Sequence, residues 1–248
     1  MKVTLVQQDI VWASPEANRR HLEDMLAHVS GTDLIVLPEM FSTGFATDPS
    51  DIAEEAPAPS LEWMKRLARE KDCAVAGSIA LHEDGRYRNR FYFVTPDGGA
   101  VHYDKKHLFT YGGEHLTFTP GEQRVVVEWR GWRFLLLVCY DLRFPVWARS
   151  REDYDAIICV ASWPEVRREP WDLLLRARAI ENQCYVLGVD RTGTDPKCVY
   201  NGGTALIDPW GKVAASAPDG VECLLEAEME KAALEGFRAA FPVLKDRD

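Results

Sequence analysis

Residues 132–145 read WRFLLLVCYDLRFP and contain an unbroken apolar run that ends at a cysteine. The run is too short to span a membrane and has the length of a strand that is buried on both faces. Cys139 therefore stands where a buried strand ends, and Pro145 shortly after it is compatible with the start of a helix. Backbone N–H groups at such a junction lack partners and can stabilise a thiolate or an oxyanion. This stretch leaves two interpretations of Cys139 open, a catalytic nucleophile or a buried structural thiol, and the second is the commoner.

Buried strands alternate with amphipathic helices outward from this stretch. The spacing of apolar residues predicts helices over residues 14–29, 60–72, 171–183 and 229–241. Short apolar or alternating runs predict strands over residues 1–9, 33–38, 73–81, 87–95, 124–129, 155–161, 184–190 and 221–226, and a hairpin over 204–215. Ser14 and Ser60 are the predicted N-caps of the first two helices.

An approximate repeat of these elements predicts how they are arranged. A buried strand, a helix, a second buried strand and a β-hairpin occur twice, and the hairpins carry Pro96-Asp97-Gly98 and Pro209-Trp210-Gly211. We therefore expect an α/β fold, a four-layer α/β/β/α sandwich of two packed mixed sheets with outer helices. Because no linker or low-complexity tract divides the chain, residues 1–248 are expected to form one domain.

The charge balance narrows the classes of partner. Lys and Arg number 29 and Asp and Glu number 39, so the net charge is 29 − 39 = −10. This balance argues against binding to nucleic acid or to an anionic membrane surface. Residues 1–9 predict a strand and not a signal peptide.

The cysteines and histidines predict neither disulfides nor a metal site. The six cysteines form no CxxC pair, and the six histidines form no HExxH motif. We therefore expect reduced thiols, a cytoplasmic protein and neither metal nor cofactor.

Three residues at or near predicted strand ends have complementary chemistry: Glu39, Lys105 and Cys139. A cysteine nucleophile needs a base, and a carboxylate shielded from water can serve as one. A neighbouring lysine can stabilise the oxyanion that forms on the attacked carbonyl. Each residue taken singly is also compatible with an ordinary role, since a loop glutamate and a charged strand edge are common on protein surfaces.

The segments around these residues resemble, in order and spacing, the three signature segments of the nitrilase (carbon–nitrogen hydrolase) superfamily. They read LPEMF at residues 37–41, YDKKHLF at 103–109 and VCYDLRFP at 138–145. The resemblance implies Glu39 as general base, Lys105 as oxyanion stabiliser and Cys139 as nucleophile. The family pattern Lys-x-His-Leu-Phe matches Lys105 and leaves Lys106 at the variable position.

The resemblance extends over nearly the whole chain and implies a fold and an activity. A second family glutamate, which helps to orient the lysine and the substrate, matches Glu114, and the family fold is the four-layer sandwich. The Cys-Tyr-Asp-Leu-Arg-Phe-Pro segment is similar to the amidase branch, especially to ω-amidases that act on 2-oxo acid monoamides. Aliphatic amidase, nitrile hydrolase and N-acyltransferase activities use the same site and stay open, as does a binding protein that kept only the fold.

The expected substrate is a small-molecule amide, and the expected assembly is a homodimer, as is usual in the superfamily. Tyr140, Phe41 and Trp163 are the predicted walls of the substrate pocket. A 2-oxo acid also carries a carboxylate, for which an arginine is a suitable partner. Sequence position leaves four arginines open for that role: Arg143, Arg167, Arg168 and Arg191.

Overall fold

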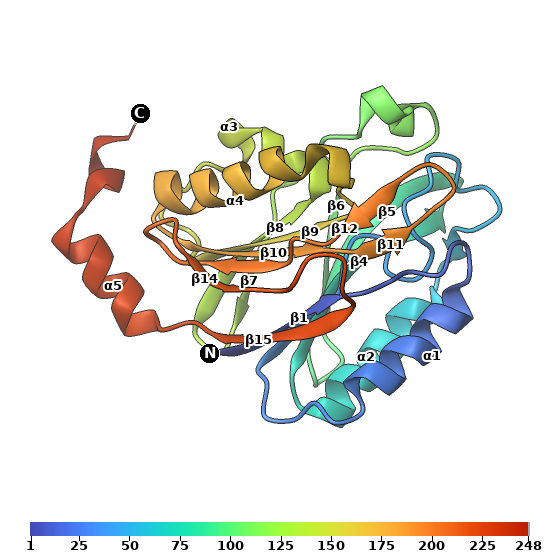
Figure 1. Cartoon of the computed structure of the whole chain (residues 1–248), viewed down its shortest axis with the longest axis horizontal. Coiled ribbons are helices and arrows are strands. Elements are labelled where there is room, and N and C mark those ends of the chain that lie inside the picture. The colour runs from blue at the N-terminus through green and yellow to red at the C-terminus, as the bar shows by residue number, and fades with distance from the viewer. Residues whose placement is uncertain (248) are drawn as a thin grey trace.

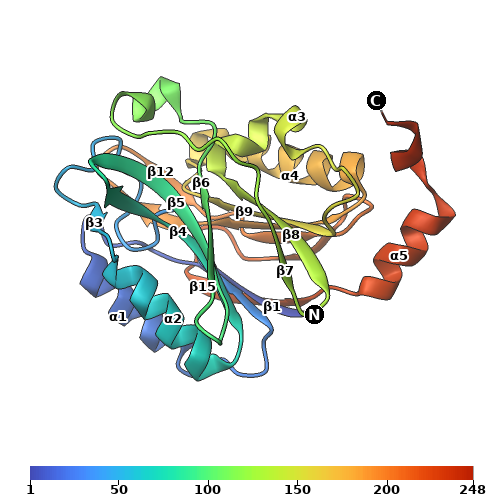
Figure 2. The same ribbon diagram turned by 180° about the vertical axis from the view of Figure 1, so that it is seen from behind.

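Two mixed β-sheets packed face to face form the centre of the molecule, and the computed structural model describes residues 1–247 (Figures 1 and 2). The first sheet has the strand order β15-β1-β2-β4-β5-β6, with β3 beside β4. The second sheet has the order β14-β13-β10-β9-β8-β7, and β11 and β12 form a separate hairpin. The predicted sandwich of two mixed sheets is confirmed.

The helices and strands have the following bounds. The first sheet contains β1 (Lys2–Gln7), β2 (Leu34–Val36), β3 (Glu54–Glu55), β4 (Ala74–Glu83), β5 (Arg86–Val94), β6 (Ala100–Asp104) and β15 (Cys223–Glu228). The second contains β7 (Val126–Trp129), β8 (Trp132–Val138), β9 (Ala156–Ala161), β10 (Tyr185–Asp190), β13 (Ala205–Ile207) and β14 (Val213–Ser216), and the hairpin is β11 (Thr192–Thr194) and β12 (Val199–Asn201). The α-helices are α1 (Pro15–Leu26), α2 (Pro59–Lys71), α3 (Pro145–Ala148), α4 (Arg168–Asn182) and α5 (Lys231–Ala240).

Three apolar clusters correspond to the three interfaces between the four layers. The central cluster joins the inward side chains of both sheets, among them Phe91 and Leu136. A second cluster packs the other face of the first sheet against α1 and α2. A third packs the outer face of the second sheet against α4, where Trp171 is fully buried. Successive residues of one strand supply different clusters, because side chains of a strand alternate between its faces.

The two sheets repeat one topology, as the sequence predicts. In the first sheet β1, β2 and β4 are parallel, and β5 and β6 follow as antiparallel neighbours. In the second sheet β8, β9 and β10 are parallel, and β13 and β14 follow in the same way. An antiparallel strand closes the other edge in each case, β15 beside β1 and β7 beside β8. The carboxyl ends of β2, β8 and β9 meet at one end of the sandwich, which is where the candidate residues lie.

Helix α5 does not belong to the outer layers, in contrast to the expectation for residues 229–241. It extends from one side of the molecule, away from the α1–α2 pair (Figures 1 and 2), and meets only the C-terminal end of α4, where Arg238 Nε donates to the carbonyl oxygen of Gln183 at 2.9 Å. Asp155, at the start of β9, anchors it by accepting hydrogen bonds from Lys231 and Arg238 (2.5 and 3.2 Å). Asp155 also accepts one from Arg133 at 2.9 Å.

Two predicted helix starts differ from the structure. The N-cap residue of helix α2 is Ala58, which forms no side-chain capping hydrogen bond. The hydroxyl of Ser60, the predicted N-cap, instead donates to the buried carboxylate of Glu54 at 2.5 Å. Helix α4 begins at Arg168, ahead of the predicted start. Pro170 is tolerated in its first turn because N–H groups there have no partner within the helix.

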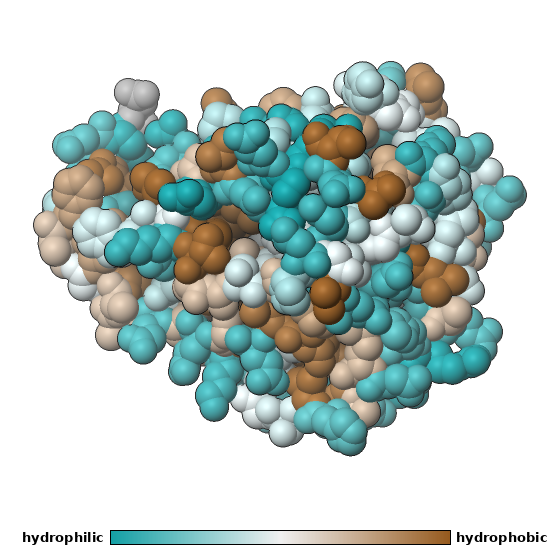
Figure 3. Space-filling model, viewed as in Figure 1, coloured by the Kyte–Doolittle hydropathy of each residue, from teal (hydrophilic) through white to brown (hydrophobic). Residues whose placement is uncertain are grey.

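The face of the molecule in Figure 3 is largely polar, with separate apolar patches between the polar side chains. Among residues 1–247, no helix has the length and apolar character needed to cross a membrane.

Candidate active site

Glu39 lies in the tight turn that follows β2, and its side chain is fully buried. The turn is tied to β4, because the N–H of Met40 donates to the Ser78 hydroxyl at 2.9 Å. It is also tied to the second sheet, because the N–H of Ser162, just beyond β9, donates to Glu39 Oε2 at 2.9 Å. Ser162 Oγ donates in turn to the Glu39 carbonyl oxygen at 3.3 Å. The carboxylate is thus held in one orientation between the two sheets.

Lys105 follows β6 and joins the two predicted glutamates. Its Nζ donates to Glu39 Oε1 at 2.9 Å and lies 3.0 Å from Glu114 Oε2, and all three side chains are fully buried. Glu114 belongs to a short 3₁₀ turn in the loop that leaves β6, and its Oε2 also accepts the N–H of Phe109 at 2.5 Å. The loop closes at Gly121, where a side chain would collide with the carbonyl oxygen of Asp104.

Cys139 occupies a strained position at the end of β8. Its φ of +48° is in the left-handed region, which residues other than glycine rarely adopt and which is frequent at functional sites. It begins a 3₁₀ turn, Cys139–Arg143, so the N–H of Tyr140 has no partner within that turn. Cys139 is partly exposed as a residue, in contrast to the buried Cys159 and Cys184.

Asp141 connects the turn of Cys139 to the segment that carries Lys105. Its Oδ2 accepts the Tyr103 hydroxyl at 2.8 Å and the N–H of Val138 at 3.0 Å. Its Oδ1 accepts the N–H of His107 at 2.9 Å and lies 2.8 Å from His107 Nδ1. One buried carboxylate therefore fixes both sides of the site relative to each other.

Burial and the shared lysine determine the protonation states. Burial raises the pKa of the Cys139 thiol well above its usual value, the Glu39 carboxylate adds to this, and Lys105 opposes it. The thiol is therefore neutral at pH 7 and needs a base. Burial also raises the pKa of Glu114, against the effect of Lys105. Burial alone would lower the pKa of Lys105, but Glu114 and Glu39 more than offset this, so the ammonium is retained.

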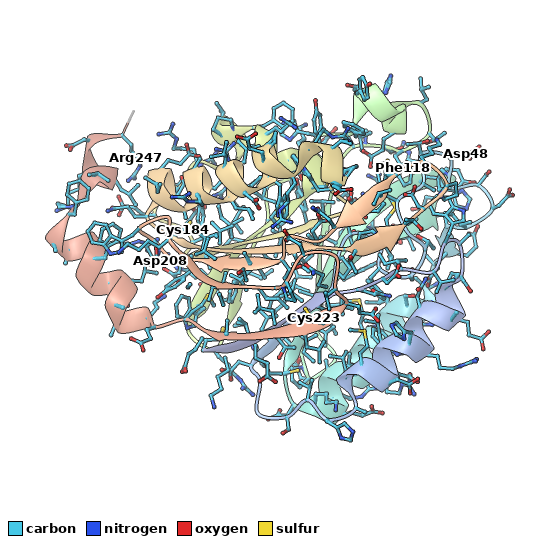
Figure 4. All side chains as sticks on the ribbon, viewed as in Figure 1. Asp48, Phe118, Cys184, Asp208, Cys223 and Arg247 are labelled. Carbon is cyan, nitrogen blue, oxygen red and sulfur yellow. The ribbon has the colours of Figure 1, made fainter. Side chains whose placement is uncertain are left out.

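Cys139 and Lys105 open onto one cavity, which encloses about 460 Å³, part of it open to solvent. Its walls are Phe45, Lys105, Phe109, Cys139, Tyr140, Arg143, Ser162, Trp163, Pro164, Arg167, Cys198 and Tyr200. In Figure 4, Asp48 and Phe118 mark the end of the sheets to which the Glu114 loop belongs, whereas Cys184 and Asp208 lie at the opposite end.

The structure brings together Glu39, Lys105, Glu114 and Cys139, and it places Tyr140 and Trp163 in the cavity wall. The prediction that Phe41 lines the substrate pocket is wrong. Phe41 is fully buried in the cluster under α2 and packs against Trp63 with ring centroids 5.8 Å apart, so it does not reach the cavity. Met40, between Glu39 and Phe41, has a φ of +46°, so the alternation of side chains along a strand does not hold across this turn.

Two of the four candidate arginines line the cavity. Arg143 lies over the ring of Trp163 at 4.9 Å and Arg167 over that of Phe109 at 5.4 Å. Arg168 instead forms surface ion pairs with Asp172 and Asp219. Arg191 is fully buried and donates to backbone carbonyls, including that of Ile10 at 3.1 Å.

Sequence reasoning missed Asn89, which contacts both glutamates. A signal was present, because Asn89 is the polar member of an inward-facing alternation that continues with Phe91 and Phe93. The backbone N–H of Ser162 had no such signal, since any residue but proline supplies one. Among residues 1–247, no group of three or more His, Cys, Asp or Glu side chains is placed to hold a metal ion.

A protein family and several known proteins are similar to this chain over nearly its whole length. The family model described as carbon-nitrogen hydrolase matches residues 2–239. The chain is 46% identical to the omega-amidase YafV of Escherichia coli (strain K12), with 100% of this chain and 97% of the relative covered. It is 33% identical to the 2-oxoglutaramate amidase of Bacillus subtilis (strain 168), with 98% and 96% covered.

A solved structure is similar over the same length. XC1258 from Xanthomonas campestris, a CN-hydrolase superfamily protein with an arsenic adduct in its active site, is 40% identical to this chain. The two superpose with a TM-score of 0.97 over 100% of this chain and 97% of the other.

Proposed function

This chain belongs to the carbon–nitrogen hydrolase family, and we propose that it is an ω-amidase that hydrolyses the terminal amide of a small 2-oxo dicarboxylic acid monoamide. The products are the 2-oxo dicarboxylic acid and ammonia. The observation that carries the proposal is the buried cluster of Glu39, Lys105 and Glu114 beside a cavity that also exposes Cys139.

In the first half-reaction, Glu39 takes the proton from the Cys139 thiol as the sulfur attacks the amide carbon. Lys105 and the N–H of Tyr140 stabilise the oxyanion that forms on the former carbonyl oxygen. The oxyanion then collapses, the carbon–nitrogen bond breaks, and Glu39 returns its proton to the nitrogen. Ammonia leaves, and the acyl group remains on Cys139 as a thioester.

In the second half-reaction, Glu39 takes a proton from water as the water oxygen attacks the thioester carbon. The carbon–sulfur bond breaks, the sulfur regains the proton from Glu39, and the carboxylic acid is released. Glu114 takes no proton in either half. We assign it to holding Lys105, in agreement with its contact to that ammonium and to the N–H of Phe109.

The two arginines in the cavity wall support an anionic substrate. Neither Arg143 nor Arg167 forms an ion pair with a carboxylate among residues 1–247, whereas Arg168 beside the cavity pairs with Asp172 and Asp219. Guanidinium groups bind carboxylates strongly when both face a partly dehydrated cavity. Tyr140 and Trp163 supply the remaining substrate contacts in this proposal.

The test is ammonia release from 2-oxoglutaramate, 2-oxosuccinamate, glutamine, asparagine and simple aliphatic amides, with Cys139→Ala as the blank. The proposal requires the highest kcat/KM for the two oxo acids and no turnover by the variant. Preference for an aliphatic amide or for a nitrile would replace the ω-amidase assignment but keep the site. Accumulation of an N-acyl product when an amine is added would indicate acyl transfer.

We also propose one domain, a homodimer and a reducing compartment such as the cytoplasm. The central cluster that joins both sheets supports one domain. Leu173 and Ile180 on α4 are more than half exposed, which supports an interface over that helix. Catalysis needs a free thiol, which supports a reducing compartment. Light scattering coupled to size exclusion measures the oligomeric state.

A further inference from the structure

Asn89 is a buried polar residue of β5 that the mechanism above does not use. The residue is 1% exposed, and its side chain contacts the two glutamates of the site. Nδ2 is 2.8 Å from Glu39 Oε1 and 3.3 Å from Glu114 Oε1, so the amide donates to both carboxylates. The backbone of Asn89 also accepts the N–H of Lys105 at 3.0 Å.

The surroundings fix the orientation of this amide. Both of its close neighbours are carboxylate oxygens, which accept hydrogen bonds only, so the NH₂ end must face them. Oδ1 then points away and has no hydrogen-bond partner among residues 1–247. A buried oxygen without a partner lowers stability, so packing does not explain an asparagine here. The two hydrogen bonds to the carboxylates of Glu39 and Glu114 explain why an asparagine stands at this position.

The N–H of Ser162 reaches only Oε2 of Glu39, and Lys105 cannot hold the other oxygen, Oε1, throughout the reaction. Its ammonium is shared between Glu39, Glu114 and, in the transition state, the oxyanion. In the same step Glu39 becomes protonated, which weakens its attraction to Lys105. A neutral donor that stays with Oε1 in both protonation states of Glu39 meets this need, and Asn89 is placed to be that donor.

We propose that Asn89 is a positioning residue, which keeps Glu39 aimed at the thiol and the leaving nitrogen while Lys105 turns to the oxyanion. The inference rests on the roles proposed above for Glu39 and Lys105. Asn89 touches neither the substrate nor the reacting atoms in this account, and it acts through the two carboxylates.

The test replaces the amide by an apolar side chain of similar volume, Asn89→Leu. We expect kcat to fall about 100-fold, since a small misplacement of a catalytic group has an effect of that order, while KM changes little. The acid limb of the pH–rate profile should move to higher pH, because a carboxylate that loses a hydrogen-bond donor binds its proton more tightly. Asn89→Ser retains an O–H donor and should recover part of the rate.

Phe91→Leu is the matched control, because Phe91 is buried two residues further along the same face of β5. It should lower the melting temperature without moving the pH–rate profile. Asn89→Leu activity that matches wild type, or that falls only by the fraction of unfolded protein, overturns the proposal.

A second readout does not depend on turnover. The rate at which iodoacetamide alkylates Cys139 is measured against pH by peptide mass spectrometry in wild type and in Asn89→Leu. A shifted profile supports the positioning role, and an unchanged profile overturns it. If wild type releases ammonia from no amide, the proposed function fails, and this measurement still decides the role of Asn89.

Discussion

Arg143 is the residue on which the preference for an anionic substrate can be tested most directly. Arg143→Gln removes a charged donor from the cavity wall, and a hydrogen bond to a charged group is worth about 1.5–3 kcal/mol. KM for a 2-oxo acid monoamide should therefore rise about 10–100-fold. KM for an uncharged aliphatic amide should stay the same.

Arg168→Gln serves as the control for Arg143, because Arg168 lies outside the cavity and pairs with Asp172 and Asp219. Steady-state kinetics with both amides measures the difference. An equal rise of KM for the charged and the uncharged amide would contradict a carboxylate-binding role for Arg143.

Lys105→Met should affect both activity and stability. Loss of one preorganised oxyanion donor lowers kcat by about 10²–10³-fold. It also leaves Glu39 and Glu114 buried without a cation, and breaking a buried ion pair costs about 3–5 kcal/mol of unfolding free energy at pH 7.

The stability loss of Lys105→Met should shrink as the pH falls. The folded-state pKa of Glu114 is already raised, and removal of the ammonium raises it further, so the folded variant binds protons that the unfolded chain does not. Urea unfolding at pH 7.5 and pH 5 measures this. An equal loss at both values would show that the two carboxylates do not interact with Lys105 as the distances indicate.

The chemistry of the site could be predicted from the sequence, but its walls only in part, since Tyr140 and Trp163 line the cavity and Phe41 does not. Glu39, Lys105 and Cys139 stand in segments whose residue types point to one reaction. Phe41 was misplaced because sequence proximity to Glu39 does not determine the direction of a side chain in a turn. Asn89 was missed because its partners are 50 and 25 residues away along the chain, and only the fold brings them together.

The 3₁₀ turn after β8 depends on Asp141 for its position relative to β6. Asp141→Asn keeps the shape but cannot accept all four hydrogen bonds, because one oxygen becomes an NH₂ group. We expect kcat to fall at least 10-fold as Cys139 and Lys105 lose their fixed separation, in line with the sensitivity of rate to geometry.

Tyr103→Phe isolates one of the four bonds and should have a smaller effect of the same kind. Kinetics and far-UV circular dichroism on both variants separate misplacement from unfolding. Full activity of folded Asp141→Asn would remove the argument for this carboxylate as the link.

Asp155 is one of the contacts that attach helix α5, together with the burial of Leu234 in the central cluster and the packing of Phe237 against Trp210. Burial alone would raise the pKa of Asp155, but hydrogen bonds from Arg133 and Lys231 outweigh this and lower it to about 2. The depressed pKa stabilises the folded state by about 2 kcal/mol at neutral pH, relative to an unfolded value near 3.8. This contribution is complete above pH 4 and is lost as the pH falls through 2.

Asp155→Asn should therefore lower the unfolding free energy by about 2 kcal/mol at pH 7, and the difference from wild type should disappear towards pH 2. Activity should be unchanged, because Asp155 precedes β9 and Ser162, which holds Glu39, follows it. Glu235→Gln on the exposed side of α5 is the control for the change in charge. A difference that persists at pH 2 would contradict this account.

Apolar periodicity in the sequence predicted the positions of the helices and strands along the chain, but it did not predict which surface each helix packs against. The pattern over residues 229–241 predicted a helix, yet periodicity identifies an apolar face and not the surface that the face covers. The position of α5 is set by contacts to residues that are distant in sequence, among them Asp155 and Gln183. The hairpin of β11 and β12 was also missed, because its strands of three residues are too short for a periodic signal.

The central apolar cluster joins the two sheets, and therefore the two halves of the molecule, so the stability of each sheet depends on the other. Leu136→Ala removes a fully buried side chain of β8 from this cluster and should cost about 2–5 kcal/mol of unfolding free energy. Val221→Ala, at a position about half exposed just before β15, should cost less than about 0.5 kcal/mol. Chemical denaturation of the two variants measures both values, and similar losses would contradict this view of the core.

The repeated topology relates the strand ends on the two sides of the site. Cys139 follows β8, and the corresponding strand of the first sheet, β1, is followed by Gln8. Lys105 follows β6, and the corresponding β14 is followed by Ala217. A symmetric dimer of half-length chains would present every group twice at its axis. In one continuous chain the two halves can differ in sequence. The carboxylates and the ammonium of the site therefore come from the first half, and the thiol of Cys139 comes from the second. Each half can then change its own contribution without duplicating the change across the site.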